Sequence, residues 1–418
     1  MDPIRVRPIS SLLLGLFLSA VGNGLQSTLV PLRAGLEGFA QPSIGGIMSA
    51  YFVGYLLGAM AVPRLIHRAG HIRAFAALAS LASVVTLLHL VVVNPWFWAV
   101  FRALNGLCIC ALSVIIESWL NGHALPQHRG KILSLAGLIT VVAIALGQLL
   151  LNLAGPDDFV LFCLVSIAIS LALVPLSLTR SSAPCVSQSQ GLKVRRLLAI
   201  TPLGAGGMFL TGLSMGAFLG MSPTYVQSLG GGLDTREISL FMAMLMLGAV
   251  CLQWPLGWLS DRIDRRRVIA CVLCANLSVC LVFVFFARPQ ALALLPLAFF
   301  LGGFGQSLYA LFAAWVNDQL PPEQALATAR NLLLVFGLGS AIGPFAASLL
   351  MGGIGPDGLF WLLSLVYVLM LGATLWDLFA KHAGAREKRE NTFVTIYCHS
   401  PIGNQSGGKG VEMPDERE

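Results

Sequence analysis

The sequence predicts an all-α polytopic membrane protein in which twelve transmembrane helices form two six-helix parallel pseudo-repeats. Three observations carry this prediction: the chain has little charge, its apolar segments are long, and motifs of its first half recur in its second half. Of the 418 residues, 56% are hydrophobic and only 11% are charged, whereas ordinary soluble domains contain about 25% charged residues. Disorder of the whole chain is excluded, because disordered segments have low hydrophobicity.

Twelve apolar segments have the length that crosses a hydrocarbon core about 30 Å thick. Their hydrophobicity does not alternate at every second residue, as it would in the strands of a transmembrane barrel. The first segment follows Arg5 and Arg7 as a signal sequence would, but it lacks a cleavage site of small residues, so we expect it to be retained. The predicted spans are 10–32, 44–65, 73–93, 96–120, 131–153, 159–179, 202–226, 238–259, 267–287, 291–317, 326–351 and 357–380.

Lysine and arginine indicate the orientation of these spans. With the N-terminus inside, the inner segments contain 22 of these residues and the outer loops contain three, Arg33, Arg236 and Arg288. Inner loops of membrane proteins are rich in positive charge. We therefore expect a multi-pass protein of the cell inner (cytoplasmic) membrane with both termini in the cytoplasm. The net charge of +7 is explained by this orientation, and we expect no nucleic-acid partner.

The two halves repeat each other in the same order. A Trp-x-Asn run followed by Leu-Pro begins at Trp119 and recurs at Trp315, and the matched motifs are offset by 194 to 200 residues. Parallel repeats of this kind build the binding site of many transporters near the middle of the membrane. We divide the chain into an N-terminal six-helix bundle at 1–179, a cytoplasmic linker at 180–201, a C-terminal six-helix bundle at 202–380 and a disordered cytoplasmic tail at 381–418.

A charged loop occurs once in each half. It reads GWLSDRIDRRR at 257–267, and an eroded copy reads PRLIHRAGHIR at 63–73. With the twelve spans and the central linker, these loops resemble the major facilitator superfamily, whose loop motif reads roughly G-x-L-x-D-R-x-G-R-R. The second copy departs from it at Asp264, which replaces the later glycine. The first copy departs at Pro63 and His67, which replace the first glycine and the aspartate.

Three short runs narrow the resemblance. They are GHIRAF at 70–75, ESWLN at 117–121 and RGK at 129–131, and they resemble the YcaD-type branch of the superfamily. The resemblance covers residues 8–380, essentially the whole membrane part. It implies a transporter fold, and this branch brings no well-defined substrate with it.

The resemblance also implies a gate on the cytoplasmic side. In the superfamily the loop aspartate bonds the N-terminal end of a helix of the opposite half. Asp261 would accordingly meet the start of the fifth span near Gly130 and Lys131, with Arg267 as a further partner. A carboxylate at the C-terminal end of its own helix lies at the negative end of the helix dipole, which favours an outside partner. The alternative is that the loops only fix the topology. The gate candidates are Gly257, Asp261, Arg262, Arg265, Arg266, Arg267, His67, Arg68, Gly70 and Arg73.

The fourth span carries polar residues on one face at 3.6 residues per turn, namely Arg102, Asn105, Ser113 and Glu117. An arginine in lipid costs about 2.5–3.5 kcal/mol on insertion scales, so this face is expected to line a cavity. Arg102 with Gly106 resembles a motif of the superfamily that is linked to proton coupling. Glu117 is the only acidic residue well inside a span, which makes Glu117 and Arg102 the proton-coupling candidates. The alternative is that both side chains snorkel to the membrane surfaces.

Polar residues also recur on the other spans that line the central cavity of the superfamily, spans 1, 7 and 10. The first span places three of them at i, i+4 and i+7, on one helix face. The alternative is that such residues form hydrogen bonds between helices, worth about 0.6 kcal/mol each, without any ligand. The cavity candidates are Ser19, Asn23, Gln26, Asn105, Ser113, Thr211, Ser214, Gln306 and Tyr309.

We therefore expect a secondary active transporter of a small solute that works by alternating access and uses protons, because the sequence has no nucleotide-binding loop. The mixed lining favours an amphipathic or hydrophobic compound. In the eleventh span Gly337, Gly339, Gly343 and Pro344 resemble a glycine-proline motif of antiporters. In exporters that motif lies on the fifth span, where this chain has no proline, and the alternative is that these glycines serve close packing and bending. Efflux is slightly favoured. One alternative is an importer of a small polar metabolite. Another is a non-transporting membrane receptor or scaffold on the same fold.

No zinc-ligand spacing and no nucleophile elbow occurs in the sequence. We therefore expect no enzymatic activity, no cofactor and no metal. The expected partners are a small-molecule substrate, protons and the lipid bilayer, and we expect the protein to act as a monomer.

Overall fold

A computed structural model describes residues 3–123, 128–178, 201–229, 234–286, 291–319 and 325–388. The chain divides into two units, Met1–Leu378 and Phe379–Glu418, and the fold and the cavity described below belong to the first. The helices are α1 (Pro3–Leu36), α2 (Gln41–Ala69), α3 (His71–Val91), α4 (Pro95–His123), α5 (Arg129–Leu149), the 3₁₀ helix η2 (Leu150–Leu153), α6 (Val160–Leu171), α7 (Leu173–Ser177), α9 (Pro202–Ser228), α10 (Thr235–Ser260), α11 (Arg265–Phe286), α12 (Ala291–Asn317), α13 (Ala325–Ile354) and α14 (Gly358–Lys388).

Within the described residues, twelve helical segments are long and apolar enough to cross a membrane, if α5 is joined with η2 and α6 with α7. Each coincides with a span predicted from the sequence, and the described residues contain no strand. The predicted fold class is therefore confirmed. α14 continues to Lys388, past the point at which we expected the tail to begin. Residues 179–200 and 389–418, which hold nearly all of the predicted linker and tail, lie outside the described residues, so the domain boundaries stay a prediction.

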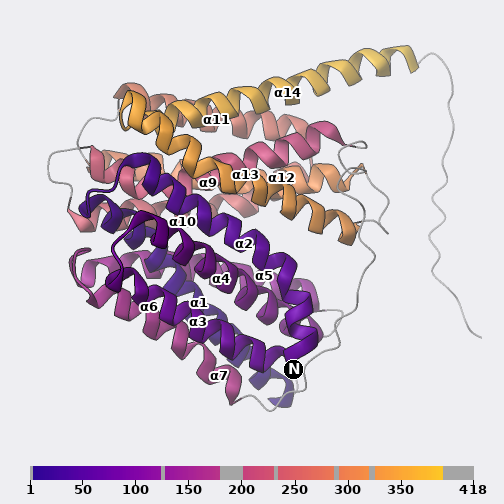
Figure 1. Ribbon diagram of the computed structural model, residues 1–418. Helices are drawn as coiled ribbons and strands as arrows, with labels where there is room; N and C mark the ends of the chain where they lie inside the picture. The colour runs from indigo at the N-terminus through magenta and orange to yellow at the C-terminus, as the bar shows by residue number, and fades with distance from the viewer. Residues whose placement is uncertain are drawn as a thin grey trace, which may run out of the picture. The chain divides into compact units, whose positions relative to one another are not determined.

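Each half of the first unit is built from the same helix pairs. α1 packs on α5 and α2 on α4 in the first half, just as α9 packs on α13 and α10 on α12 in the second. Between the halves, α2 packs on α13 and α5 packs on α10. In Figure 1, α3, α6 and α7 lie on one flank, and α11 lies with the first part of α14 on the other flank. The eight pair-forming helices therefore make up the centre of the unit.

Glycines bring these central helices into backbone contact. A Cβ atom on Gly54 of α2 would overlap the carbonyl group of Ala103 on α4, and a Cβ atom on Gly106 of α4 would overlap the carbonyl group of Tyr51 on α2. Small residues at such crossings let membrane helices approach closely. This crossing therefore fixes the position of Tyr51 relative to the polar face of α4.

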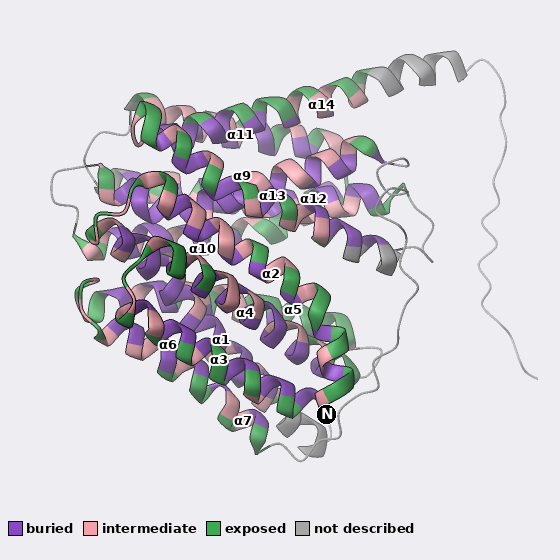
Figure 2. Ribbon diagram, in the orientation of Figure 1, coloured by how far each residue is buried: buried purple, intermediate pink, exposed green. Residues whose placement is uncertain are grey.

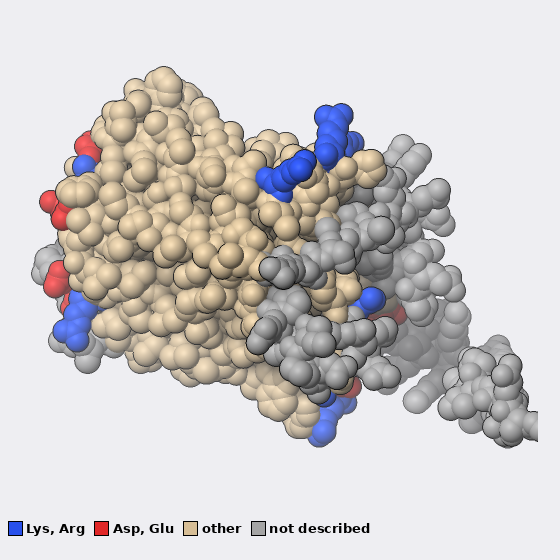
Figure 3. Space-filling model, turned by 90° about the horizontal axis from the view of Figure 1, so that it is seen from below, with Lys and Arg blue, Asp and Glu red and all other residues tan. Residues whose placement is uncertain are grey.

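The connections define two ends of the unit. The basic end carries the α2–α3 and α10–α11 loops, and the opposite end carries the α1–α2 loop, the end of α9 and the start of α10. Charged side chains lie toward both ends, and a broad band of uncharged atoms separates them (Figure 3). Exposed residues lie along the outer faces of the helices in Figure 2, and they include large apolar side chains such as Val84, Leu247 and Leu365. Exposed apolar surface of this extent is typical of a protein embedded in lipid.

Candidate functional site

A cavity of about 590 Å³ lies between the two halves. α1, α2, α4 and α5 line it from the first half, and α9, α10, α12 and α13 line it from the second. The sequence predicted α1, α4, α9 and α12 as lining helices, and α2, α5, α10 and α13 complete the wall. Small-molecule sites often lie in concave, mostly apolar spaces between the helices of a bundle.

The cavity is closed at the opposite end, where hydrogen bonds join the halves. The Phe345 backbone amide of α13 donates to the Ser49 hydroxyl of α2 at 3.1 Å. The Asn152 side chain of η2 donates to the Ser239 hydroxyl at the start of α10 at 2.8 Å. Close packing of Gly45 against the Ser348 side chain lies in the same region. These contacts tie α2 to α13 and η2 to α10.

At the basic end, α5 and α10 lie further apart. Gly137 in the first half of α5 and Gln253 in the last part of α10 line the cavity and are exposed, whereas the lining residues Gln148 and Met242, nearer the opposite end, are buried. A Cβ atom on Gly130, in the first turn of α5, would meet no atom within 4 Å. The α5–α10 pair is therefore packed at one end and separated at the other. The cavity accordingly opens toward the basic end.

The polar candidates divide into two groups by position. Ser19, Asn23, Ser113, Gln306 and Tyr309 line the cavity. The other four are buried away from the cavity wall: Gln26, Asn105, Thr211 and Ser214. Three of them donate hydrogen bonds within the protein: Gln26 donates to Thr86 of α3 at 3.2 Å, and the Thr211 and Ser214 hydroxyls donate to backbone carbonyls of their own helix. A polar residue at helical spacing can thus face a neighbouring helix instead of the cavity.

Arg102 lies in the cavity wall and is fully buried, with an exposed fraction of 0%. Its guanidinium carbon lies 4.4 Å from the ring centroid of Tyr51, which is the geometry of a cation–π contact. The Tyr51 hydroxyl donates to the Asn23 side-chain oxygen at 3.0 Å. The three nitrogens of the guanidinium have no hydrogen-bond acceptor among the described residues. Arg102, Tyr51 and Asn23 therefore form one polar cluster, contributed by α4, α2 and α1.

Tyr51 was not among the residues singled out from the sequence, although a signal for it exists. Tyr51 and Tyr55 lie one turn apart on α2, beside the Gly54 contact with α4. Both line the cavity together with Tyr309, so three of the six tyrosines of the chain meet there. Tyrosine combines an apolar ring with a polar tip and suits a wall that is partly polar. Paired tyrosines next to a helix-crossing glycine are the pattern that points to them.

Glu117 lies apart from Arg102. Fifteen residues separate the two on α4, which is about 22 Å along the axis at 1.5 Å per residue. Glu117 is exposed, on the part of α4 that approaches the basic end. It interacts electrostatically with Tyr55 of the cavity wall and with Cys110. The two proton-coupling candidates therefore share a helix, but they do not form an ion pair.

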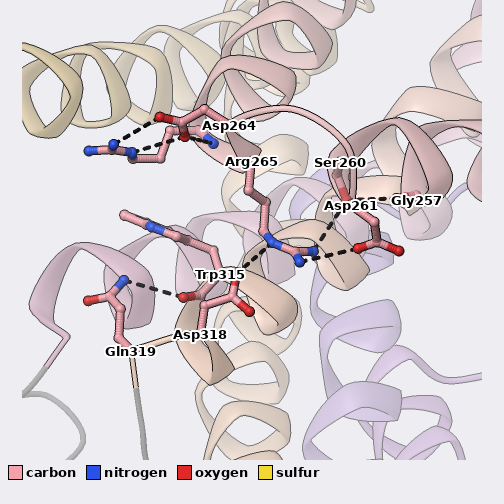
Figure 4. Close-up of polar contacts among 9 residues, drawn as sticks. Gly257, Ser260, Asp261, Asp264, Arg265, Trp315, Asp318 and Gln319 are labelled. Atoms are coloured by element: carbon pink, nitrogen blue, oxygen red, sulfur yellow. Dashed lines mark hydrogen bonds and ion pairs between the residues drawn. The ribbon is translucent and has the colours of Figure 1, made fainter. Parts of the chain in front are cut away.

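The loop of the second half forms ion pairs within its own half (Figure 4). The Arg265 guanidinium lies between two carboxylates, at 3.2 Å from Asp261 and 2.8 Å from Asp318. The Ser260 hydroxyl donates to the Gly257 carbonyl at 2.8 Å and accepts from Arg265 at 3.2 Å. Arg265 thereby links the α10–α11 loop to the end of α12.

A second arginine ties the same loop to α14. Arg266 lies 2.9 Å from Asp264 and 3.4 Å from Asp377. The hydrogen bonds from Arg266 hold the pKa of the Asp264 carboxyl below its usual range, although partial burial acts in the other direction. The Arg262 guanidinium lies over the Trp258 ring at 3.8 Å, and the Arg267 side chain is exposed.

The position of Asp261 differs from the gate that the resemblance implied. Asp261 is 70% exposed and pairs with Arg265 of its own half, and the space around Gly130 at the start of α5 is open. The physical reason is the separation of α5 and α10 at the basic end, which keeps the two helix ends apart. A contact between Asp261 and α5 would need that end to close.

The loop of the first half has a different construction. Gly70 joins α2 to α3 with φ of +77°, a conformation that glycine adopts readily, and its amide donates to the Ile66 carbonyl. His67, Arg68 and Arg73 are exposed. The shape of the α2–α3 loop is therefore set by the backbone conformation of Gly70, whereas ion pairs hold the α10–α11 loop.

Comparison with known proteins agrees with the architecture. The family model described as "Major Facilitator Superfamily" matches residues 12–232 and 204–402. An uncharacterized MFS-type transporter of Enterobacter sp. (strain 638) is 29% identical over 371 residues, which cover 87% of this chain and 95% of that protein. The uncharacterized MFS-type transporter YcaD of Escherichia fergusonii is 29% identical over 375 residues, covering 88% and 96%.

Solved structures show the same fold at low sequence identity. The crystal structure of a mutant of the nucleoside transporter NupG superposes with a TM-score of 0.78 at 12% identity and covers 88% of this chain and 99% of that one. A bacterial homolog of the human lysosomal transporter Spinster, in an inward-facing and unoccupied conformation, superposes with a TM-score of 0.69 at 14% identity, covering 95% and 100%.

Proposed function

The chain belongs to the major facilitator superfamily, and from that premise we propose that it is a secondary active transporter that moves a small solute by alternating access. The observation that carries the proposal is the cavity of about 590 Å³ between the halves, closed by the α2–α13 and η2–α10 contacts and open toward the basic end. Rocking of the six-helix bundles, which we place at 1–179 and 202–380 and connect by the linker at 180–201, would expose this cavity to each side in turn. The protein would act as a monomer.

Uptake by proteoliposomes tests the transport proposal. Purified protein would be reconstituted, a pH gradient imposed, and radiolabelled solutes of several chemical classes screened, with protein-free liposomes as the control. We expect at least one class to accumulate only in the presence of protein and gradient. Absence of solute movement and of proton flux across all classes would contradict the proposal.

We further propose that protons drive transport and that Glu117 and Arg102 take part. Glu117 is the acidic residue of α4 that is exposed near the basic end, within electrostatic range of the cavity residue Tyr55. Glu117→Gln removes its titration while it keeps its size, so gradient-driven accumulation should be lost and solute exchange without a gradient retained. Glu37→Gln, outside the cavity wall, is the matched control. Unchanged gradient-driven accumulation in Glu117→Gln would remove Glu117 from this role.

We propose efflux of an amphipathic or hydrophobic compound, supported by the apolar part of the cavity wall. The polar side chains of the first half support the alternative, an importer of a small polar metabolite. Inside-out membrane vesicles separate the two proposals, because an exporter accumulates its solute in them and an importer does not. The orientation that we propose, with both termini in the cytoplasm of a cell with an inner membrane, would be tested by fusing a reporter to the C-terminus.

Finally, we propose that the loop residues form a cytoplasmic gate in the state that is closed at the basic end. Asp261 would leave Arg265 and meet the N-terminus of α5 near Gly130 and Lys131, whose free backbone amides favour an anion. Asp261→Asn should then raise the reactivity of a cysteine introduced at Gly137, which lines the cavity on α5 and has room for a side chain. Equal labelling rates in both proteins would leave these residues with only a topological role.

A further inference from the structure

The charge of Arg102 has no counter-ion in the cavity. Arg102 is 0% exposed, and its Nε, Nη1 and Nη2 atoms lack an acceptor among the described residues. Buried charges in proteins are normally paired, because their desolvation is not otherwise offset. No aspartate or glutamate is found among the described residues that line the cavity, and Glu117 is about 22 Å away along α4. The protein thus presents a buried positive charge without supplying the negative one.

The immediate neighbours of Arg102 are neutral: Asn23 keeps a hydrogen-bond donor available, and His89 keeps an acceptor. Because Asn23 accepts from Tyr51 through its oxygen, its amide NH₂ group remains a donor beside the guanidinium. His89 of α3 lies close to Arg102. In its neutral ring Nδ1 carries the hydrogen and donates to the Val85 carbonyl at 2.9 Å, which leaves Nε2 as an acceptor without a partner among the described residues. Neutral groups of this kind can solvate a cation, but they cannot neutralise it.

The wall across the cavity, formed by the second half, has no charged residue and is mostly apolar. Besides the neutral polar residues Gln253, Gln306, Tyr309 and Ser340 it contains Met215, Leu219, Met242, Met246 and Phe336. Methionine side chains are flexible and polarizable, so they adapt to apolar groups of different shape. An inorganic anion at Arg102 would leave this wall and most of the 590 Å³ without a contact. The two walls together match a molecule with one anionic group and an apolar body.

We propose that the cavity binds an organic anion, whose carboxylate or phosphate pairs with Arg102 and whose apolar body lies against the methionine and phenylalanine side chains of the second half. This inference rests on the proposed transport function and specifies its substrate class. The Tyr51 ring covers the guanidinium, so the anion meets the Tyr51 hydroxyl first and reaches Arg102 when that ring turns aside. An arginine offers planar, bidentate recognition of carboxylate and phosphate groups.

Binding to the purified full-length protein tests this inference with probes that differ only in charge. The probes are 4-phenylbutyrate, its neutral amide 4-phenylbutanamide and its cationic amine 4-phenylbutylamine, together with the corresponding octanoic series and phenyl phosphate. Ligand-induced shifts of the unfolding temperature would be titrated in detergent. We expect saturable stabilisation by at least one anion, and at least tenfold weaker stabilisation by the amide and amine of the same body.

Variants of Arg102 connect the binding to this residue. Arg102→Gln should lower the binding affinity for the anion at least tenfold, to the affinity for the amide. Arg102→Lys keeps the charge and should lower the affinity for the anion less. Tyr51→Phe, which removes only the hydroxyl, should change the affinity less than Arg102→Gln does. Arg64→Gln, an exposed arginine outside the cavity, is the matched control and should bind as the unmodified protein does. Arg102→Lys also keeps the test valid if Arg102→Gln fails to fold.

Three results would overturn the inference: no stabilisation by any anion, equal or better stabilisation by the neutral or cationic partners, or anion binding that persists in Arg102→Gln. Its failure can be told apart from failure of the transport proposal. If proteoliposomes accumulate a neutral or cationic solute while no anion binds, the transporter stands and the substrate class is wrong. If an anion binds through Arg102 but no solute crosses the membrane, the binding site stands and the transport proposal is wrong.

Discussion

The two halves of the chain pack their central helices alike but place different side chains at equivalent positions. Gly54 contacts the Ala103 carbonyl in the first half, and Gly248 contacts the Phe299 carbonyl in the second. These positions are related by the repeat, since 54 + 194 = 248 and 103 + 196 = 299. The contact between Gly106 and the Tyr51 carbonyl likewise recurs between Gly302 and Leu245. The repeat therefore preserves the backbone crossings.

The polar cluster has no equivalent in the second half. With the same offsets, Arg102 corresponds to Ala298, and Tyr51 corresponds to Leu245. Both second-half residues are fully buried. Between α1 and α9 the offset is 192, since Gly24 contacts the Ile144 carbonyl as Gly216 contacts the Ser340 carbonyl. Asn23 therefore corresponds to Met215, which lines the cavity. A pseudo-symmetric cavity can thus be chemically one-sided, because close packing constrains only the small residues at the crossings.

The basic end reverses this asymmetry. Arg265 of the second half pairs with Asp261 and Asp318, whereas its first-half equivalent, His71, is buried against the Trp119 ring at 5.8 Å between centroids. The first half therefore holds the charge of the cavity, and among the described residues the second half holds the ion pairs of the loop. Substitutions of the cavity charge, the crossing glycines and the loop charges therefore test how far the stability of each half depends on its own side chains.

Placing the charge of the first half into the second should have the largest effect. Ala298→Arg puts a guanidinium at the position equivalent to Arg102, among Leu245, Leu301 and other apolar side chains, without the tyrosine and asparagine of the first half. The penalty of an unpaired buried charge adds to overpacking. We expect no folded protein, measured as the absence of a monodisperse peak after detergent extraction.

Ala298→Leu adds volume without charge, so it separates the cost of overpacking from the cost of the buried charge. It should be recovered in folded form with a lowered unfolding temperature. Folded Ala298→Arg with an unchanged unfolding temperature would show that the second half tolerates the charge as the first half does.

The shared helix crossings should respond alike in the two halves. Gly54→Val and Gly248→Val each force the helix against a backbone carbonyl, and overpacking of this kind costs about 1–3 kcal/mol or more. We expect comparable decreases in the unfolding temperature of both variants. Gly46→Ala is the control on α2, because a Cβ atom there meets nothing within 4 Å. A large decrease in only one variant would contradict equivalent packing of the halves.

Removing the buried charge from the first half should leave the fold intact. Arg102→Met keeps much of the volume and removes an unpaired cation, which costs about 2.5–3.5 kcal/mol on insertion scales, while it loses a cation–π contact worth about 0.5–2 kcal/mol. We expect an unfolding temperature equal to or above that of the unmodified protein, together with loss of solute transport. A clear decrease in stability would identify Arg102 as a structural residue.

Much of the fold could be predicted from the sequence, because span length and hydrophobicity are local properties. The twelve spans and the repeat follow from them, and the overlap of Gly54 with Ala103 explains why a glycine recurs at each crossing. The helices that line the cavity were only half predicted. Whether α2 faces the cavity depends on its crossing with α4, which is a tertiary property.

The candidate site shows the same limit at individual residues. Arg102 could be identified because an arginine is rare in an apolar segment. Tyr51 was missed because an aromatic residue is ordinary there, and its pairing with Tyr55 is informative only together with the helix crossing at Gly54. Gln26 has cavity-like spacing, but it bonds Thr86 of α3. Asp261 pairs with Arg265 of its own half, whereas the resemblance implied a partner on α5. The gate that we propose would change this partner with the conformational state, and no pattern of residues determines which state is observed.

The smallest expected effect concerns the loop charges of the second half. Asp264 bonds Arg266, whereas its first-half equivalent, Gly70 (264 − 194 = 70), has no side chain. Because the folded-state pKa of Asp264 is lowered, its ionised form stabilises the fold at pH values above the unfolded pKa of about 3.9, and this stabilisation is lost as pH falls through the folded value. Ion pairs of this exposed kind contribute less than about 1 kcal/mol.

Asp264→Asn should therefore lower the unfolding temperature slightly at pH 7 and not at all once the pH lies below the folded pKa of Asp264. Unfolding would be followed in detergent at both pH values, with Asp157→Asn at the opposite end as the control. A difference that is the same at neutral and acidic pH would show that the Asp264 carboxylate acts through shape alone. A difference that vanishes on acidification would place part of the acid sensitivity in the second-half loop, where the first half relies on the backbone of Gly70.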